Sequence, residues 1–453
     1  MRRLLIANRG AIAARILRAA KALGMESIAV YSDADRDLPY LAQADHRMAL
    51  KGCDVLATYL NQNAILDIAR LTGAHAIHPG CGALAENAVF ARRVEAAGMR
   101  FIGPSSRWID ALHGTQARAL VAGHGMPMGP SSSLLGSDLG AVRVAAERIG
   151  YPVLVKAAGG NGIDILPIRS REDVQRTWRQ AGSIAARSFG HRELYLEKLL
   201  VRPRHIELQY LADRHGGVRF LYERDCSVQR RHQKIIEEAR APRLDAAELA
   251  HTGSKITGLL STMGYDGIGT VEMRYTPESG FVFLQLNTGL QIQHAVTEEV
   301  TGIDIVQAQI RLACGERIDT VAPLPIASEG HSIEARVYAE DPLRFLPSTG
   351  FLNVFAPPHL VPGIRVETGY AQGCTVSRHY DTMLATVTAS APTREAAIAS
   401  LQGALAAFEI RGVETNLSFV DAVLGDPAFK AGHIDTSLGI DLAATRLSGA
   451  KLL

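Results

Sequence analysis

The stretch LNTGLQIQHAVTE, residues 286–298, places hydrogen-bonding side chains at the end of a predicted strand. It continues the run GFVFLQL, whose alternation is typical of a β-strand. Chemistry in α/β proteins usually lies at the carboxyl ends of strands. The polar side chains from Asn287 to His294 are nevertheless uncharged groups, and the first charged side chain is Glu298. Amides can bind and orient a substrate, but they do not take up a proton as a general base does.

Two runs of the sequence offer oxygen ligands for a cation. Glu272 in GTVEMRY and Asn287 in FLQLN would suit magnesium if their strands are neighbours. A polar position on the face of a sheet is the alternative. Arg336, on the alternating run HSIEARVYAED, could reach a carboxylate-like substrate, although an arginine on the surface is the default interpretation.

A second set of residues could handle phosphates and a base. Lys156 ends the apolar run YPVLVK and is followed by AAGG, so an ammonium and backbone N–H groups could surround phosphates. The spacing is not that of a Walker A motif, and a lysine beside an ordinary turn is the alternative. Glu197 and Lys198 in YLEKLLVRPRH could form a hinge that hydrogen-bonds an adenine, or a solvated face.

The segment ERDCSVQRRHQKIIEEA is unusually dense in charge. Such a density of basic and acidic side chains over a strand-like stretch favours anion handling, whereas charge runs in general face solvent. Both interpretations stay open from the residues alone. The charged residues are Arg224, Arg230, Arg231, His232 and Lys234, with Glu223, Asp225, Glu237 and Glu238.

The elements that position these residues follow from periodicity. The 453 residues, with 47% hydrophobic and 21% charged, predict an α/β protein of two or three domains. Strands and helices alternate over the first hundred residues, which predicts a parallel sheet flanked by helices. A second unit begins between the helix near residues 138–149 and the strand YPVLVKA and runs to ELYLEKLL, which predicts a compact inserted lid. Beyond residue 204, strands at hairpin-like spacing predict a largely antiparallel sheet.

Net charge and cysteine content limit the function classes. A formal net charge of +2 argues against partners held by bulk electrostatics, so we expect neither nucleic acid nor a membrane. The five scattered cysteines fit a reduced cytosol without a zinc site or disulfide framework. The apolar run LLIA near the N-terminus is too short for a signal peptide. We therefore expect a cytoplasmic protein.

Taken together in their order and spacing, the motifs resemble one family over practically the whole chain. They are IANRG, ADRDLPYLAQAD, AIHPG, IGYPVLVKA, EK, RPRHIE, ERDCSVQRRHQKIIEEA, GTVE, VTEEVTGIDIV, EARVYAEDP, FLPSTG and VETNL. The chain resembles biotin carboxylase, the ATP-grasp subunit or domain of biotin-dependent carboxylases. The resemblance implies an N-terminal domain (1–113), an ATP-grasp region with its lid (114–203), and an ATP-grasp body with a C-terminal domain of largely antiparallel sheet (204–453).

The resemblance also implies the chemistry and the partners. In the family, ATP activates bicarbonate as carboxyphosphate, carbon dioxide is released, and deprotonated biotin attacks it. ATP and Mg²⁺ are the implied cofactors. Biotin is carried on a lysine of a separate carrier protein, and a carboxyltransferase subunit is the second expected partner. We expect either a homodimer or a heterodimer with an intact paralogue.

Matching positions carry the implied roles. Nucleotide-binding positions are Lys156, Glu197, Lys198, Leu200, His205, Gln229 and His232, the metal positions are Glu272, Gln285 and Asn287, and the matching catalytic positions are Lys234, Gln291 and Arg336.

Several positions depart from the family pattern. Gln285 replaces a metal-binding glutamate, Gly289 the bicarbonate-binding arginine, and Gln293 the general base. Thr115 stands where a phosphate-binding lysine is expected, and the glycine-rich lid loop is the shorter AAGGNGID. Further changes are Ala11, Cys81 and Arg274. A positioned base typically contributes roughly a hundred- to ten-thousand-fold in rate, so we expect weak or absent carboxylation.

Two functions of different classes stay open. The chain is either an ATP-dependent ligase, which is slow or redirected to another acceptor, or a non-catalytic structural or regulatory paralogue within a carboxylase complex. The first requires binding of a metal–nucleotide complex and the second does not.

Overall fold

A five-stranded parallel sheet forms the N-terminal part of the protein. The computed structural model describes residues 2–112, 114–157, 164–190, 192–230, 233–359 and 361–450. The strand order is β3-β2-β1-β4-β5, and every pairing is parallel, as the sequence predicts. Its elements are β1 (Arg3–Ile6), α1 (Gly10–Ala22), β2 (Glu26–Ser32), β3 (His46–Leu50), α2 (Gln62–Leu71), β4 (Ala76–His78), α3 (Ala88–Ala96) and β5 (Arg100–Phe101), with short 3₁₀ turns at Asp33–Asp35 and Pro39–Gln43.

Strand β3 was not predicted, and its burial explains why. It lies at the edge of the sheet, and only Leu50 of its five residues is buried. An edge strand with one buried residue shows little of the hydrophobic alternation that identifies a half-buried strand.

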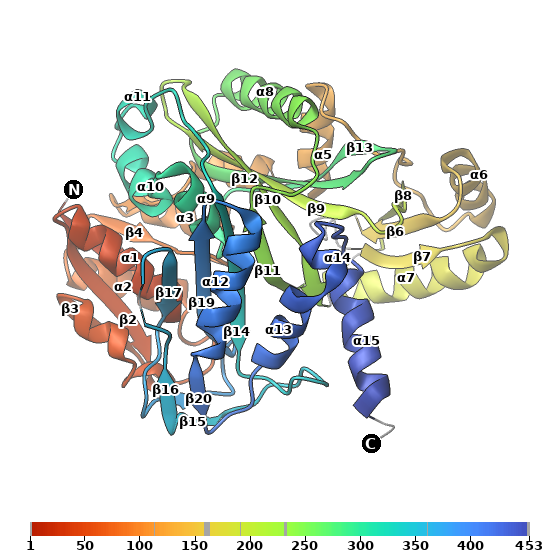
Figure 1. Cartoon of the computed structure of the whole chain (residues 1–453). Coiled ribbons are helices and arrows are strands. Elements are labelled where there is room, and N and C mark those ends of the chain that lie inside the picture. The colour runs from red at the N-terminus through yellow and green to blue at the C-terminus, as the bar shows by residue number, and fades with distance from the viewer. Residues whose placement is uncertain are drawn as a thin grey trace.

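The lid is a small α/β unit that projects from the body on the right of Figure 1. Its three strands pair antiparallel in the order β7-β6-β8. The lid has its own core, in which Val153, Val155 and Trp178 are buried between the sheet and its helices. Its elements and the two helices before it are α4 (Ser106–Ala111), α5 (Gly114–Gly123), α6 (Leu139–Ile149), β6 (Val153–Ala157), β7 (Asp164–Ile168), a 3₁₀ turn (Arg171–Asp173), α7 (Val174–Phe189) and β8 (Leu194–Lys198).

One eight-stranded antiparallel sheet runs through the rest of the chain. Its order is β13-β12-β9-β10-β11-β14-β19-β17, and all of its pairings are antiparallel. This confirms the predicted fold class. The strands are β9 (Arg204–Ala212), β10 (Val218–Arg230), β11 (Gln233–Ala239), β12 (Gly267–Thr276), β13 (Gly280–Asn287), β14 (His331–Tyr338), β17 (Ile364–Thr368) and β19 (Met383–Ala391).

Helices and short two-stranded antiparallel sheets complete the structure around this sheet. They are α8 (Ala246–Met263), α9 (His294–Thr301), α10 (Ile305–Ala313), α11 (Ile318–Val321), α12 (Arg394–Ala406), α13 (Leu417–Gly425), α14 (Pro427–Lys430), α15 (Leu438–Ala450), and the strands β15 (Gly350–Phe351), β16 (Val354–Ala356), β18 (Thr375–Val376) and β20 (Glu409–Arg411). Among the described residues, no helix is both long and apolar enough to cross a membrane.

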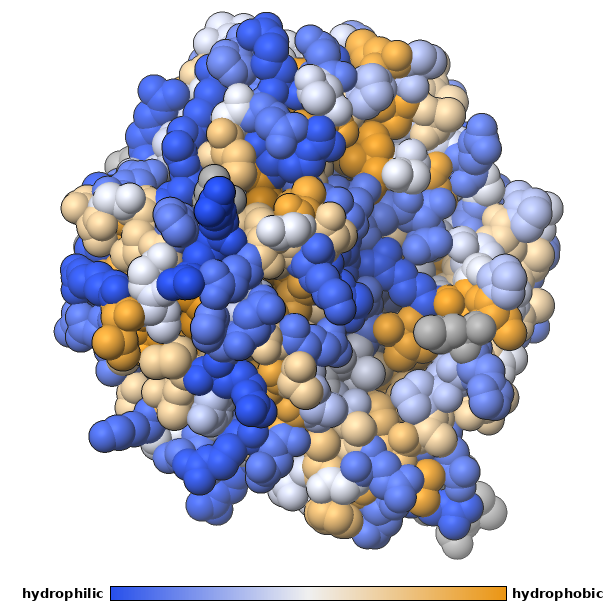
Figure 2. All heavy atoms as spheres, turned by 90° about the vertical axis from the view of Figure 1, so that its left-hand side faces the viewer, coloured by the Kyte–Doolittle hydropathy of each residue, from blue (hydrophilic) through white to orange (hydrophobic). Residues whose placement is uncertain are grey.

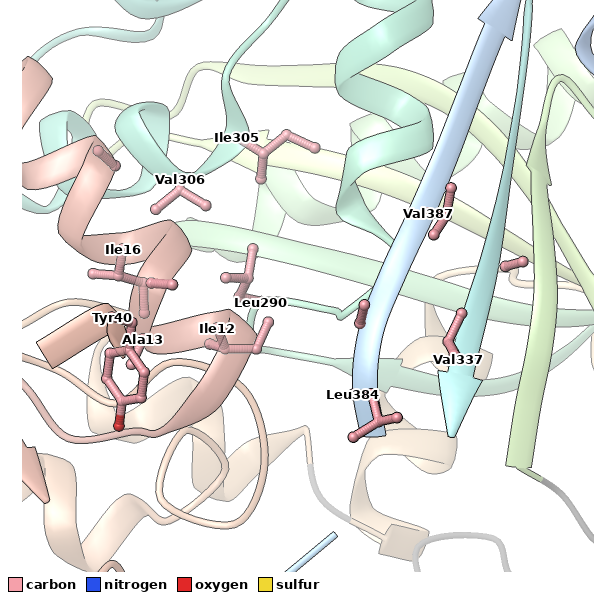
Figure 3. Close-up of a cluster of buried hydrophobic side chains, with 14 of the residues drawn as sticks. Ile12, Ala13, Ile16, Tyr40, Leu290, Ile305, Val306, Val337, Leu384 and Val387 are labelled. Atoms are coloured by element: carbon pink, nitrogen blue, oxygen red, sulfur yellow. The ribbon is translucent and has the colours of Figure 1, made fainter. Parts of the chain in front are cut away.

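The largest hydrophobic cluster joins the N-terminal helix α1 to the antiparallel sheet. Ile12 and Ile16 of α1 belong to the same cluster as Leu290 and as Val337 of β14 (Figure 3). Leu290 is 2% exposed, and this burial anchors the chain immediately after β13. The rim stretch 286–298 is therefore held against a rigid core. On the face shown in Figure 2, exposed hydrophobic side chains form small groups among hydrophilic ones.

Candidate active site

Glu207 on β9 is the central carboxylate of the site. Its side chain is fully buried and accepts a hydrogen bond from the Lys234 ammonium. Arg224 Nη2 donates to its Oε2 at 2.8 Å. Burial by itself raises the pKa of the Glu207 carboxyl, but the charges of Lys234 and Arg224 hold that pKa well below its usual value. Glu207 is therefore a permanent anion at neutral pH.

Glu272 on β12 lies directly across the sheet from Glu207. The two residues are register partners, and the Lys234 ammonium bridges them, donating to Glu272 Oε1 at 3.0 Å. His205 Nε2 lies 3.1 Å from Glu272 Oε2. Burial raises the pKa of the Glu272 carboxyl, but Lys234 and His205 outweigh burial and lower it to about 2. The two anions and one ammonium thus form a compact charged cluster.

His205 is oriented by Gln229. Gln229 Nε2 lies 2.9 Å from His205 Nδ1, and because an amide nitrogen can only donate, Nδ1 is the acceptor. The ring proton then sits on Nε2, which faces Glu272. Gln229 also donates to the Cys226 carbonyl at 2.7 Å. His205 therefore turns Nδ1 toward Gln229 and Nε2 toward Glu272.

Two amides cover the remaining side of Glu272. Strands β12 and β13 are neighbours, as the magnesium hypothesis required, and Gln285 is the register partner of Glu272. Gln285 Nε2 donates to Glu272 Oε2 at 3.1 Å, and Asn287 Nδ2 donates to Oε1 at 2.6 Å. Gln285 Nε2 also lies 3.3 Å from Asn287 Oδ1. A neutral amide at position 285 therefore stabilises Glu272 by donating to it.

Gln293 connects the anionic cluster to Arg336. Its Nε2 donates to both carboxylate oxygens of Glu207 at 2.8 Å each, and its Oε1 accepts from Arg336 Nη2 at 2.9 Å. The Gln293 side chain is almost fully buried at the start of α9. Both ends of the amide are therefore satisfied. The side chain of Gln293 therefore offers neither a basic site nor a negative charge.

Arg336 lies inside the protein, which corrects the default interpretation of a surface arginine. It is 6% exposed on β14, and it forms an ion pair with Glu237 of β11. Burial lowers the pKa of the guanidinium, but Glu237 more than compensates and keeps it charged. The solvated interpretation is also wrong for most of the charge run 223–239. Arg224, Asp225, Glu237 and Glu238 are all buried in the sheet.

Two further residues of the rim stretch and Cys81 of the N-terminal domain were also predicted to matter for the site. Gly289 faces the N-terminal domain, since a Cβ placed there would lie 3.2 Å from the Ala85 Cβ. Gln291 is partly exposed beside it. Cys81 follows strand β4, and burial raises the pKa of its thiol to about 11. The thiol therefore stays protonated at neutral pH.

The lid residues form a second group. Lys156 is fully buried, and its Nζ donates to Glu197 Oε2 at 3.1 Å. Glu197 is buried as well, so a solvated face is wrong for this residue. Lys198 donates to the Gly150 and Tyr151 carbonyls at 2.8 and 3.0 Å, which ties β8 to the loop before β6. Leu200 is partly exposed just after β8.

Three expectations lie outside what is described. His232 and loop residues 158–163 are not among the described residues. Thr115 has a described backbone within α5, but its side chain is not described. Conversely, sequence reasoning missed Glu207 and Arg118. Glu207 closes the motif RPRHIE, so the motif could have identified it, whereas no sequence signal marked Arg118.

The side chains around Glu207 and Glu272 determine which metal ion could bind at the site. His205, Glu207 and Glu272 are close enough to ligate a metal ion, but the Lys234 ammonium already contacts both carboxylates. A second cation at that point would be repelled. Glu272, Gln285 and Asn287 offer one anionic and two neutral oxygens after rotation of their amides, which fits Mg²⁺ when phosphate oxygens add charge.

Most of the chain matches known protein families. Residues 1–109 match the family model of the biotin carboxylase N-terminal domain, 114–321 that of the carbamoyl-phosphate synthase L chain ATP-binding domain, and 334–438 that of the biotin carboxylase C-terminal domain. Biotin carboxylase of Halalkalibacterium halodurans is 41% identical over 438 residues, covering 96% of each chain. The chain belongs to the biotin carboxylase family. It is also 42% identical to the Arabidopsis thaliana mitochondrial methylcrotonoyl-CoA carboxylase subunit alpha, over 96% of this chain but only 60% of that subunit.

Solved structures of biotin carboxylases share the fold and contain nucleotides. The biotin carboxylase domain dimer of Hydrogenobacter thermophilus 2-oxoglutarate carboxylase, in complex with MgADP, ADP and bicarbonate, is 38% identical with a TM-score of 0.91, covering 96% of each chain. Campylobacter jejuni biotin carboxylase in complex with β,γ-ATP is 36% identical, also with a TM-score of 0.91, covering 96% of this chain and 98% of that one. These relatives bind the nucleotides named, and the Hydrogenobacter domain is a dimer.

Proposed function

We propose that this biotin carboxylase family member binds MgATP but abstracts the proton of biotin poorly, so that carboxylation of carrier-bound biotin is strongly slowed. The bonding of Gln293 carries the proposal. Its amide is hydrogen-bonded to Glu207 at one end and Arg336 at the other, and it offers no group that can take up a proton.

The retained charges still suit an anionic substrate. The Lys234 ammonium and the Arg336 guanidinium are the retained cations of the site, and we propose that they face bicarbonate or a phosphorylated intermediate, although each is also paired with a carboxylate. Mg²⁺, where bound, would neutralise phosphate charge, and Glu272, Asn287 and Gln285 would hold it with one carboxylate fewer than the family pattern. We expect a weakened metal site, with nucleotide binding retained.

Neighbouring groups are poor replacements for the missing base, with one exception. Glu207 has a strongly lowered pKa, which makes it a weak base, and Glu237, whose pKa burial raises, is held in an ion pair with Arg336. Glu86 follows Ala85, the residue that faces Gly289, and it is exposed to solvent, although partial desolvation and the charge of Glu272 raise the pKa of its carboxyl. We propose Glu86 as the source of any residual turnover.

The test is bicarbonate- and biotin-dependent ATP cleavage with Mg²⁺, measured on the native chain, on Gly289→Arg with Gln293→Glu, and on Glu86→Gln. We expect low native activity, a large increase in the double variant, and loss of the residual activity in Glu86→Gln. Native turnover at the level of the double variant would show that another group supplies the base. Binding of MgADP, measured by calorimetry, distinguishes a slow ligase from a non-catalytic paralogue, because the latter needs no nucleotide.

The partners follow from the same proposal. We propose a dimer, since the Hydrogenobacter relative is described as a biotin carboxylase domain dimer. Biotin would come from a separate carrier protein, and a carboxyltransferase subunit would transfer the carboxyl group from that biotin to the final acceptor. The domain boundaries at 113 and 203 are part of this proposal, with the lid of residues 139–198 closing over the nucleotide.

A further inference from the structure

Arg118 on α5 is a buried guanidinium without hydrogen bonds at its terminal nitrogens. Its side chain is 11% exposed, and its Nη1 lies 3.4 Å from Glu197 Oε2. Its Cζ lies 5.8 Å from the centre of the Tyr195 ring. Within the described part of the chain, neither Nη1 nor Nη2 has a hydrogen-bond partner, although both are shielded from solvent. A buried charged donor left in this state is costly unless a ligand satisfies it.

Arg118 lies close to Lys156 of the lid, because both side chains approach Glu197. Lys156 and Tyr195 are register partners on β6 and β8, and Leu154 pairs with Glu197. Since side chains two residues apart lie on the same face of a strand, Lys156, Tyr195 and Glu197 share one face of the lid sheet. Arg118 approaches that face from α5, which itself packs against β13 of the central sheet. The guanidinium therefore lies between the lid and the body.

Two cations share one carboxylate oxygen at this point. Lys156 Nζ donates to Glu197 Oε2 at 3.1 Å, and Arg118 Nη1 approaches the same oxygen without hydrogen-bond geometry. One carboxylate cannot neutralise both cations, so the three groups together carry a net positive charge. Lys156 can neutralise Glu197 by itself, which leaves Arg118 free to turn toward an anion.

We propose that Arg118 is a phosphate-binding residue for the polyphosphate of the nucleotide. It lies one helical turn after Thr115, the position of the expected phosphate-binding lysine, and supplies the missing cation from the same helix. Guanidinium N–H groups match phosphate oxygens in pairs, and both terminal nitrogens of Arg118 have donors to spare. The inference rests on the proposed nucleotide binding and explains how binding survives the change at position 115.

The test compares MgADP with adenosine, which lacks phosphates, by calorimetry on the full chain. Arg118→Gln keeps hydrogen-bond donors but removes the charge, and Arg118→Met keeps the aliphatic stem beside Tyr195, so that one of the two variants should fold. Arg148→Gln, on the exposed side of α6, is the matched control. We expect both Arg118 variants to bind MgADP roughly ten- to a hundred-fold more weakly, with unchanged adenosine affinity. Arg118→Lys should recover part of the loss.

The outcomes separate this inference from the proposed function. If the native chain binds neither MgADP nor adenosine, the proposed function fails and the inference fails with it. If the native chain binds MgADP and the Arg118 variants bind it equally well, only the inference is overturned. Equal losses for adenosine and MgADP would indicate a structural role for Arg118 and would also overturn it. A selective loss for MgADP, absent in the Arg148 control, supports it.

Discussion

Gln293→Glu would place a carboxylate between an anion and a cation. In the native chain the Gln293 amide donates to both oxygens of Glu207 at 2.8 Å and accepts from Arg336 at 2.9 Å. A second carboxylate at about 4 Å from the first, with an effective dielectric constant of about 20, costs about 4 kcal/mol. That repulsion corresponds to about three pKa units.

Arg336 offsets only part of this repulsion, because it is already paired with Glu237. We therefore expect the introduced carboxyl at position 293 to have a pKa about one to two units above that of an ordinary glutamate. Such a carboxyl holds a proton more tightly and is a better general base near neutral pH. Because only the deprotonated form acts as a base, the rate should rise with pH through that pKa and then level off.

The assay is biotin- and bicarbonate-dependent ATP cleavage followed across pH. Gln293→Glu should increase the plateau rate by about a hundred- to ten-thousand-fold, provided that the base is the missing element. Gln402→Glu is the matched control, since it adds the same charge at a half-buried position of α12, where Gln402 donates to the exposed Asp421. A Gln293→Glu variant that binds MgADP but turns over at the native rate would refute the reasoning.

Three further predictions concern buried carboxylates of the antiparallel sheet and the groups that contact them. Gln285→Glu should lower Tm in EDTA by roughly a few degrees, because Glu272 loses a donor and gains a like charge, and added Mg²⁺ should restore it. Glu207→Gln should lower the free energy of unfolding in urea by about 3–5 kcal/mol, since buried cations lose their partner, whereas Glu26→Gln at an exposed pair should have a much smaller effect. Burial and a neighbouring carboxylate raise the pKa of Glu334 to about 8, so the folded state binds the extra proton and stability should fall from about pH 4.5 to pH 8. Glu334→Gln should flatten that decline in urea titrations, and an unchanged slope would contradict the assignment.

The alternation of apolar and polar residues along the sequence predicted much of the fold and part of the site. Alternation identified β12 and β13, and the predicted cation site at Glu272 and Asn287 required that these strands be neighbours, which they are. The cation site itself stays a prediction. Edge strand β3 was missed because its pattern is weak. The charge run 223–239 could not be placed from sequence, because burial of a charged strand depends on partners from other strands.

The amino-acid sequence by itself determined the fold class, the family and the chemical identity of the changed positions. A glutamine at position 293 cannot be a base in any surroundings, because the amide has no basic site. Only the tertiary structure decided which groups surround that amide. Glu207, Lys234 and Arg336 are distant in the chain and meet because β9, β11 and β14 belong to one sheet. The phosphate-binding role proposed for Arg118 likewise depends on its position where α5 meets the lid. Electrostatic energies depend on distance and burial, and the sequence gives neither.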